Sequence, residues 1–181
     1  MLYLRHPIDR FASVYEFERR QASESTSPSV PVAQSGDLAH FAEWTISADA
    51  TAVCRNFQVI HLSGVQHDMR DARATHEDYD RALERMSELP FFGIVELFDE
   101  SLAGFQELLR PAFGELSLQF EIKNSSVQRR GSLVERLAHV KGALGDSLYR
   151  ALLEHNALDM LFYRRALEMF HAKRAALRNL I

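Results

Sequence analysis

The sequence contains one cysteine, Cys54, among its 181 residues. A single thiol excludes an internal disulfide framework and is typical of a reducing compartment, so we expect Cys54 to be a small core residue. Positive charge is not in excess either, because 21 lysines and arginines stand against 25 acidic residues, giving a formal net charge of −4. Neither a nucleic acid nor an anionic membrane is therefore indicated as a partner, and any anion site must be local.

Long apolar runs are also absent. No stretch approaches the roughly 20 apolar residues that a transmembrane helix needs. The polar segment at residues 5–7 interrupts the start of the chain before the apolar core of a signal peptide could form, which predicts a cytoplasmic protein. Eight histidines are present, but His61, His67 and His76 lack the ligand spacing of a metal site, so no metal is predicted.

The residues that are present indicate one domain over residues 1–181, since hydrophobic residues make up 46% of the chain. Periodic patterns predict several helices, which begin after Pro7, at Asp37, Thr75, Asp99 and Ser132, and near residues 146 and 158. Short apolar or alternating runs predict strands at Leu2–Leu4, Phe91–Phe98 and Leu118–Ile122. Few strands among many helices indicate a helix-rich α/β fold.

Several local features refine this prediction. The stretch 21–36 is rich in serine and proline and is expected to be a mobile surface loop. The segment 51–62 fits a helix or an extended strand. Capping boxes are predicted at Thr75 with Asp78 and at Ser132 with Glu135, and two glycines, 142 and 145, are expected to break the helix that begins at Ser132.

The first twenty residues carry most of the functional information. They predict a short buried strand, a turn at Pro7 and an amphipathic helix, with Arg5 at the end of the strand and Ser13 on the first turns of the helix. A guanidinium beside a hydroxyl and a helix N-terminus suits an anion with several oxygens, above all a phosphate. The alternative is a surface arginine and a helix-facing serine without a ligand.

The wider pattern Leu-Arg-x-Pro-x-x-Arg-Phe-x-Ser-x-Tyr at residues 4–15 resembles the 3′-phosphate-binding segment of sulfotransferases that use 3′-phosphoadenosine 5′-phosphosulfate (PAPS). The resemblance implies that Arg5 and Ser13 hold the 3′-phosphate of PAPS or of its product, adenosine 3′,5′-bisphosphate. It also implies the C-terminal portion of a P-loop-like sulfotransferase fold with a short, mostly parallel sheet. His6 departs from the family pattern, which has an acidic residue before the proline.

Further matches occur in the family's order. Residues 56–64 resemble its Asn-x-Gln…Leu-x-Gly segment, residues 93–102 its Gly-x-x-Glu-x-Phe-x-x-Ser-Leu turn, and residues 158–170 its closing helix. In this pattern Glu96 has a structural role at a strand end. The nearest group is the carbohydrate sulfotransferases, particularly the uronosyl 2-O-sulfotransferase-like group of bacterial type, which implies a saccharide or similar hydroxyl acceptor.

The polar segment 123–131 is a second candidate contact with the nucleotide. Taken alone it is a solvated loop. The resemblance places it where the family has a hydroxyl-rich and basic loop over the nucleotide, which makes Lys123, Ser126 and Arg130 candidate cofactor-binding residues.

The sequence lacks the Gly-rich, lysine-containing loop that would hold the phosphosulfate, and in the family this loop and the catalytic base lie upstream of the segment at residues 4–15. Three interpretations stay open: a truncated sulfotransferase, a degenerate member without activity, or a chain completed by assembly, including a homo-oligomer. The alternative function is a non-catalytic nucleotide-binding or protein-interaction module on a remnant of the fold.

Overall fold

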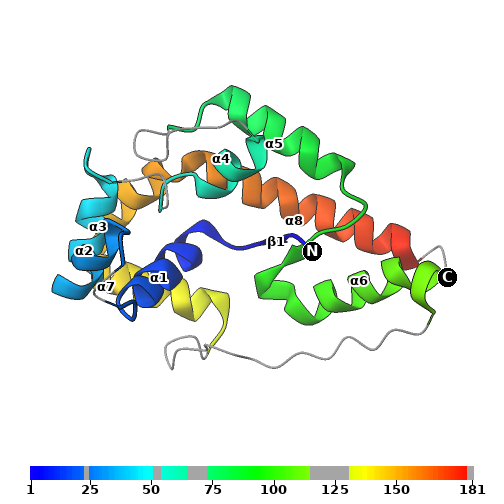
Figure 1. The fold of residues 1–181 in the computed structure, drawn as a ribbon, viewed down its shortest axis with the longest axis horizontal. Coiled ribbons are helices and arrows are strands. Elements are labelled where there is room, and N and C mark those ends of the chain that lie inside the picture. Colours follow the sequence, from blue (N-terminus) through cyan, green and yellow to red (C-terminus); the bar gives the residue numbers. More distant parts are fainter. Residues whose placement is uncertain (23–24, 51–53, 65–72, 115–130, 179–181) are drawn as a thin grey trace.

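The computed structural model describes residues 1–22, 25–50, 54–64, 73–114 and 131–178. Within these residues the fold is rich in helix and contains a two-stranded parallel sheet, which confirms the helix-rich α/β prediction at this level (Figure 1). The elements in chain order are β1 (Tyr3–Leu4), α1 (Pro7–Glu18), α2 (Ser29–Ser35), α3 (Leu38–Ile46), α4 (Phe57–Ser63), α5 (His76–Glu88), β2 (Gly93–Ile94), the 3₁₀ helix η2 (Val95–Leu97), α6 (Phe98–Phe113), α7 (Leu133–His155) and α8 (Ala157–Arg178).

The helices form two groups (Figure 1), and each group has its own apolar core. The first core lies between the sheet and helices α4, α5, α6 and α8, and it is rich in aromatic rings such as Phe92, Phe162 and Phe170. The second core lies among α1, α2, α3 and α7, around Phe11 and Phe41. Cys54 is buried in this second core, as expected. Residues 5 and 6 join the two groups, because they connect β1 to α1.

The strand pair is short for a physical reason. Tyr3 pairs with Gly93 and Leu4 with Ile94, and the Tyr3 ring lies so close to Gly93 that a Cβ there would come within 2.4 Å of it. The predicted strand 91–98 is wrong beyond residue 94. The hydroxyl of Ser101 accepts a hydrogen bond from the backbone N of Ile94 at 2.9 Å, so a side chain from α6 replaces the next strand contact and the chain turns into η2.

Two other sequence predictions need correction or completion. Residues 29–35 of the expected loop form α2, because Val30 and Ala33 lie one turn apart and are both buried. Pro31 is compatible with this helix because it occupies the first turn, where its missing N–H would have no helical partner. The ambiguous segment 51–62 contains a helix, α4, from Phe57 onwards. The predicted strand Leu118–Ile122 lies outside the described residues.

Both predicted capping boxes are present, at Thr75 with Asp78 and at Ser132 with Glu135. The predicted breaks in the second of these helices are half right. Helix α7 continues through Gly142, whereas Gly145 has φ 70° and ψ 169° and kinks the helix. None of the described helices is long and apolar enough to cross a membrane.

The two glycines of α7 give a matched test of this kink. A Cβ added at either position meets no atom within 4 Å, so sterics with neighbours do not distinguish them. We expect Gly142→Ala to raise the free energy of unfolding by up to about 1 kcal/mol, because alanine favours a helix interior. Gly145→Ala should lower it by about 1 kcal/mol, because its positive φ disfavours an L side chain. Chemical denaturation of both variants measures the sign; the same sign in both would contradict the kink.

Candidate functional site

The backbone of Arg5 is fixed by a glutamine from α4. The side chain of Gln58 accepts a hydrogen bond from the Arg5 N–H at 2.9 Å and donates one to the Arg5 carbonyl, also at 2.9 Å. Gln58 is buried, so these two bonds continue the pairing of β1 past the point where its sheet ends. They set the position from which the Arg5 side chain extends.

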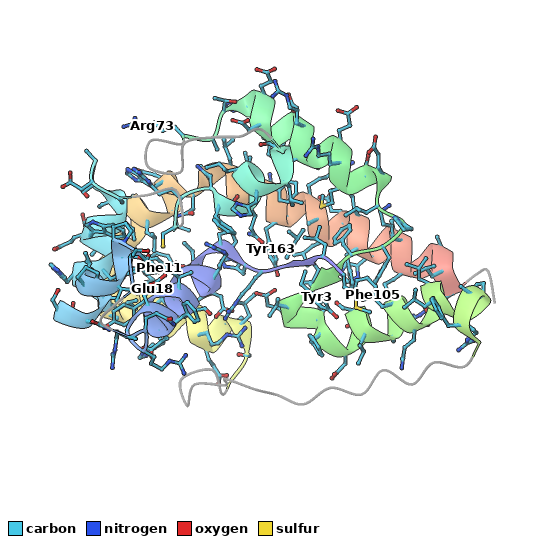
Figure 2. All side chains as sticks on the ribbon, in the orientation of Figure 1. Tyr3, Phe11, Glu18, Arg73, Phe105 and Tyr163 are labelled. Carbon is cyan, nitrogen blue, oxygen red and sulfur yellow. The ribbon has the colours of Figure 1, made fainter. Side chains whose placement is uncertain are left out.

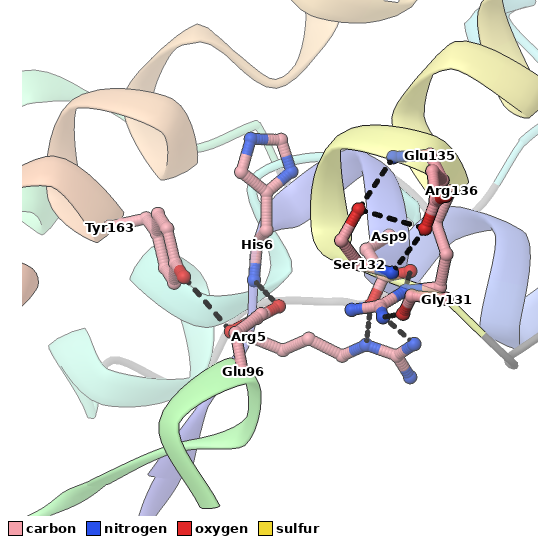
Figure 3. A network of polar contacts seen from close by, with 9 residues as sticks. All are labelled: Arg5, His6, Asp9, Glu96, Gly131, Ser132, Glu135, Arg136 and Tyr163. Atoms are coloured by element: carbon pink, nitrogen blue, oxygen red, sulfur yellow. Dashed lines mark hydrogen bonds and ion pairs between the residues drawn. The ribbon is translucent and has the colours of Figure 1, made fainter.

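The next residue, His6, is held by a carboxylate from the opposite side. Glu96 accepts a hydrogen bond from the His6 N–H at 2.8 Å and another from the Tyr163 hydroxyl at 2.9 Å (Figure 3). Burial and the neighbouring Glu96 raise the pKa of Tyr163, which keeps its phenol protonated as the donor. The structural role expected of Glu96 is therefore confirmed: it ties the end of β1 to α8.

Helices α4 and α8 begin beside one another and cap each other. Asp159, which is 1% exposed, accepts hydrogen bonds from the backbone N–H groups of Gln58 and Val59 at 3.1 and 2.9 Å. In return, Asn56 accepts from the backbone N–H of Asp159 at 3.0 Å, while its own N–H donates to Asn156 at 3.1 Å. Asn56 makes these hydrogen bonds from the left-handed conformation, with φ 47°.

The four segments that carry the resemblance thus converge in space. Segment 4–15 contains Arg5, segment 56–64 contains Gln58, and segment 93–102 contains Glu96. Segment 158–170 contains the carboxylate that caps the helix of Gln58 and the tyrosine that donates a hydrogen bond to Glu96. Their side chains surround two backbone positions, Arg5 and His6. These contacts form a rigid frame around the exit of β1.

The side chain of Arg5 belongs to an ion triad that links α1 to α7. Asp9, one helical turn after Arg5, accepts a hydrogen bond from Arg5 Nε at 2.6 Å. The other oxygen of Asp9 accepts from Arg136 Nε at 2.8 Å, and Arg136 also donates to the Gly131 carbonyl at 2.8 Å. Figure 3 shows Arg5, Asp9 and Arg136 together. The carboxylate is 4% exposed, and the two arginine side chains are 14% and 18% exposed.

This environment changes two pKa values in the triad's neighbourhood. Burial alone would raise the pKa of Asp9, but the hydrogen bonds and charges of Arg136 and Arg5 outweigh it and hold the pKa below its ordinary value. Burial lowers the pKa of His6, and the charge of Arg136 lowers it further against the opposing effect of Asp9. Asp9 is therefore ionised and His6 neutral at pH 7, so the triad keeps one net positive charge.

Arg5 and Ser13 line the same cavity, which has a volume of about 250 Å³ and lies between α1, α3 and α7. We call it the Arg5 pocket. Its charged and polar lining also includes Arg19, Arg136 and His139 on the basic side, with Asp9, Glu16 and Asp37 on the acidic side. Asp37 is engaged as the cap of α3, where it accepts from the His40 N–H at 2.9 Å. The three arginines and three acidic side chains of the lining balance in formal charge, and the pocket offers arginine donors beside the hydroxyl of Ser13.

The structure brings together two of the five predicted site residues. Lys123, Ser126 and Arg130 lie outside the described residues; the next described residue, Gly131, already contacts Arg136. Sequence reasoning missed Asp9, Arg136 and His139. The capping box at Ser132 was a usable signal for the last two, because it fixes the start of α7 and so places residues 136, 139, 140 and 143 on one helix face.

The described part of the site shows no feature of a metal centre. Among the described residues, no group of three or more histidine, cysteine or acidic side chains could hold a metal ion. Burial raises the pKa of the Cys54 thiol to about 12, which makes it inert as a nucleophile at neutral pH. The chemistry that the arrangement supports is the binding of an anion.

Comparison with known proteins gives a relative in an archaeon. A protein of Archaeoglobus fulgidus, described as an uncharacterized protein, is 28% identical over 171 residues, which cover 94% of this chain and 66% of the relative. The chain thus spans slightly less than two thirds of the length of the relative it matches. No family model matches the chain, and no solved structure matches it. The likeness extends along nearly the whole chain and is not confined to one motif.

Proposed function

We propose that the Arg5 pocket binds the 3′-phosphate of a nucleotide of the adenosine 3′,5′-bisphosphate type, and that the chain is a sulfotransferase-family domain that uses PAPS. The observation that carries the proposal is the meeting of Arg5 and Ser13 in one cavity. In the sequence these residues are eight positions apart, which by itself does not show that they face the same space. Their shared cavity supports the phosphate role, because both side chains line the space that one ligand could occupy.

The donors of Arg5 support a phosphate ligand. The Arg5 bonds to Asp9 use Nε and Nη2, so the guanidinium is oriented by the ion pair while Nη1 does not take part in it. Arginine donors held in one plane match the oxygens of a phosphate, and a hydroxyl such as that of Ser13 adds a further donor.

The framework around Arg5 supports the same proposal, because binding strength depends on how little must be ordered when the ligand arrives. Gln58 and Glu96 fix the backbone on both sides of the peptide that precedes α1. Gln58 acts as a positioning residue for Arg5 in this account, since it holds the backbone and not the ligand.

The transfer reaction needs more groups than the Arg5 pocket contains. Sulfuryl transfer needs an acceptor hydroxyl that attacks in line, a base for its proton, and donors on the leaving oxygens of PAPS. The sequence supplies no phosphosulfate loop pattern, and we assign no residue of the chain as the base. We propose a saccharide or similar hydroxyl compound as the acceptor. The alternative is a non-catalytic nucleotide-binding module, which requires only the Arg5 pocket.

Calorimetric titration of adenosine 3′,5′-bisphosphate tests the pocket. Wild-type protein should bind, Ser13→Ala should weaken binding about tenfold, and Arg5→Ala should weaken it by about a hundredfold, because hydrogen bonds to charged groups contribute about 1.5–3 kcal/mol. Arg164→Ala removes an exposed arginine on α8, away from the pocket lining, and serves as the matched control. Thermal unfolding of each variant shows that it is folded.

Wild-type protein that does not bind the bisphosphate would contradict the proposal, as would variants that bind as well as wild type. Turnover with labelled PAPS and a panel of saccharides then separates the two functions. Sulfated product identifies an enzyme, whereas binding without product identifies a binding module.

A further inference from the structure

A second cavity lies at the other end of the α3 and α7 pair. Its volume is about 280 Å³, and its lining includes the charged side chains of Arg55, Arg73 and Glu154 together with His155. None of its described lining residues belongs to the Arg5 pocket. His139 in the first cavity and His155 in the second lie sixteen positions apart on α7, on opposite sides of the kink at Gly145. One small ligand therefore cannot account for both cavities.

Arg55 is fixed in this cavity by backbone carbonyls. Its guanidinium donates to the carbonyls of Ser47, at 3.2 Å, and of Ala50, which follow the end of α3. Carbonyl oxygens orient the group but leave its full positive charge in place. Among the described residues, neither Arg55 nor Arg73 forms an ion pair with an acidic side chain, including Glu154 in the same lining.

The two arginines are close enough to affect each other. Burial lowers the pKa of Arg55, and the positive charge of Arg73 lowers it further. Two like charges facing one cavity destabilise each other unless an anion lies between them. Figure 2 shows Arg73 on the segment that leads into α5, with its side chain extending away from that helix. Counting Glu154, the lining keeps one net positive charge.

We infer that this cavity is a second anion site, in which Arg55 and Arg73 bind a small oxyanion or the oxyanion group of a larger molecule. The cavity volume lies just below the range of pockets that enclose drug-sized ligands, which fits a ligand of this size. Arg55 is preorganised by the carbonyls, and Arg73 lines the same cavity from the segment that precedes α5. The inference does not depend on the nucleotide proposal, because the two cavities are separate.

Titration with inorganic sulfate, followed by amide chemical shifts in NMR spectra, tests the site. We expect Asn56 and His155 to shift in the wild type, with sodium chloride at equal ionic strength producing no such change. Arg73→Gln, at an exposed position outside every helix, should weaken the sulfate affinity read from these residues about tenfold. Arg164→Gln, which removes the same charge elsewhere, should change it less than about twofold.

Shifts at Asn56 and His155 that are absent, that chloride reproduces, or that Arg73→Gln leaves unchanged would overturn the inference. Arg55→Gln gives a second variant, with thermal unfolding as the check that its lost carbonyl contacts leave the protein folded. Ser13 and His139 report the Arg5 pocket in the same spectra. Sulfate binding at the Arg5 pocket is therefore distinguished from sulfate binding at the second cavity, and the nucleotide proposal keeps its own test by calorimetry.

Discussion

Replacement of Asp9 by asparagine is expected to lower the free energy of unfolding by about 3 kcal/mol. The substitution keeps the size of the side chain but removes the charge that holds Arg5 and Arg136 together at the junction of α1 and α7. Removing one partner of a buried ion group costs about 3–5 kcal/mol, because the remaining charges stay uncompensated. We expect the lower end of this range of unfolding free energies, because the side chains of both arginines are partly exposed to solvent. Urea denaturation at pH 7 measures the loss.

Glu16→Gln is the matched control, because it makes the same chemical change on the same helix. Glu16 pairs with Arg19 at 3.9 Å, and that arginine is 48% exposed, so the change should cost less than about 0.5 kcal/mol. Equal losses in the two variants would contradict the structural importance of the triad.

The triad also has a pH dependence with a defined sign. Because the folded pKa of Asp9 lies below its unfolded value, the carboxylate stabilises the protein fully above about pH 4 and loses this contribution as pH falls through the folded pKa. The difference in stability between wild type and Asp9→Asn should therefore shrink at low pH. A difference that grows below pH 4 would contradict this assignment.

Replacement of Asp159 by alanine is expected to lower the free energy of unfolding by a similar amount, about 3 kcal/mol. The side chain satisfies two buried N–H groups at the start of α4, on Gln58 and Val59, and each would lose its partner. An unsatisfied buried donor costs about 1–3 kcal/mol. Burial raises the pKa of Asp159, which shows that its charge is costly to bury. Removing that charge offsets part of the lost stability, so we expect a total below the sum of two donors at about 3 kcal/mol each.

Asp146→Ala provides the comparison for this variant, because its ion pair with Lys141 lies on the surface, with the carboxylate 78% exposed. It should cost less than about 0.5 kcal/mol. Since Gln58 holds the backbone of Arg5, Asp159→Ala should also loosen the start of α1, which hydrogen exchange at residues 5–10 would detect. Unchanged exchange there would show that the cap of α4 does not support the site.

Local signals in the sequence predicted local structure well. The capping boxes at Thr75 and Ser132 are made between residues three apart, and the structure contains both. The prediction for 91–98 was wrong where a residue from the next helix, Ser101, ends the strand. The helix at 29–35 was missed because its burial against a distant core outweighs its serine and proline content.

In the candidate site, too, contacts between residues close in sequence could be predicted and contacts between distant residues could not. Arg5 and Ser13 are close in sequence, so their common face could be predicted, whereas Asp9 meets Arg136 across 127 positions of sequence. No spacing rule connects such residues before the fold is known. The contacts of Gln58 with Arg5 and of Glu96 with Tyr163 likewise span 53 and 67 positions. Their residues could be named from the resemblance, but their roles as supports of Arg5 required the structure.

The central claim, that Arg5 binds the 3′-phosphate of the nucleotide, is tested most directly by removing each partner in turn. Binding of adenosine 3′,5′-bisphosphate and of adenosine 5′-monophosphate, which lacks the 3′-phosphate, is measured for wild type and for Arg5→Lys. The lysine keeps a charge near Asp9 but loses the planar donors. We predict that Arg5→Lys weakens the bisphosphate at least about tenfold and leaves the monophosphate unchanged. Equal weakening of both nucleotides, or of neither, would contradict the claim.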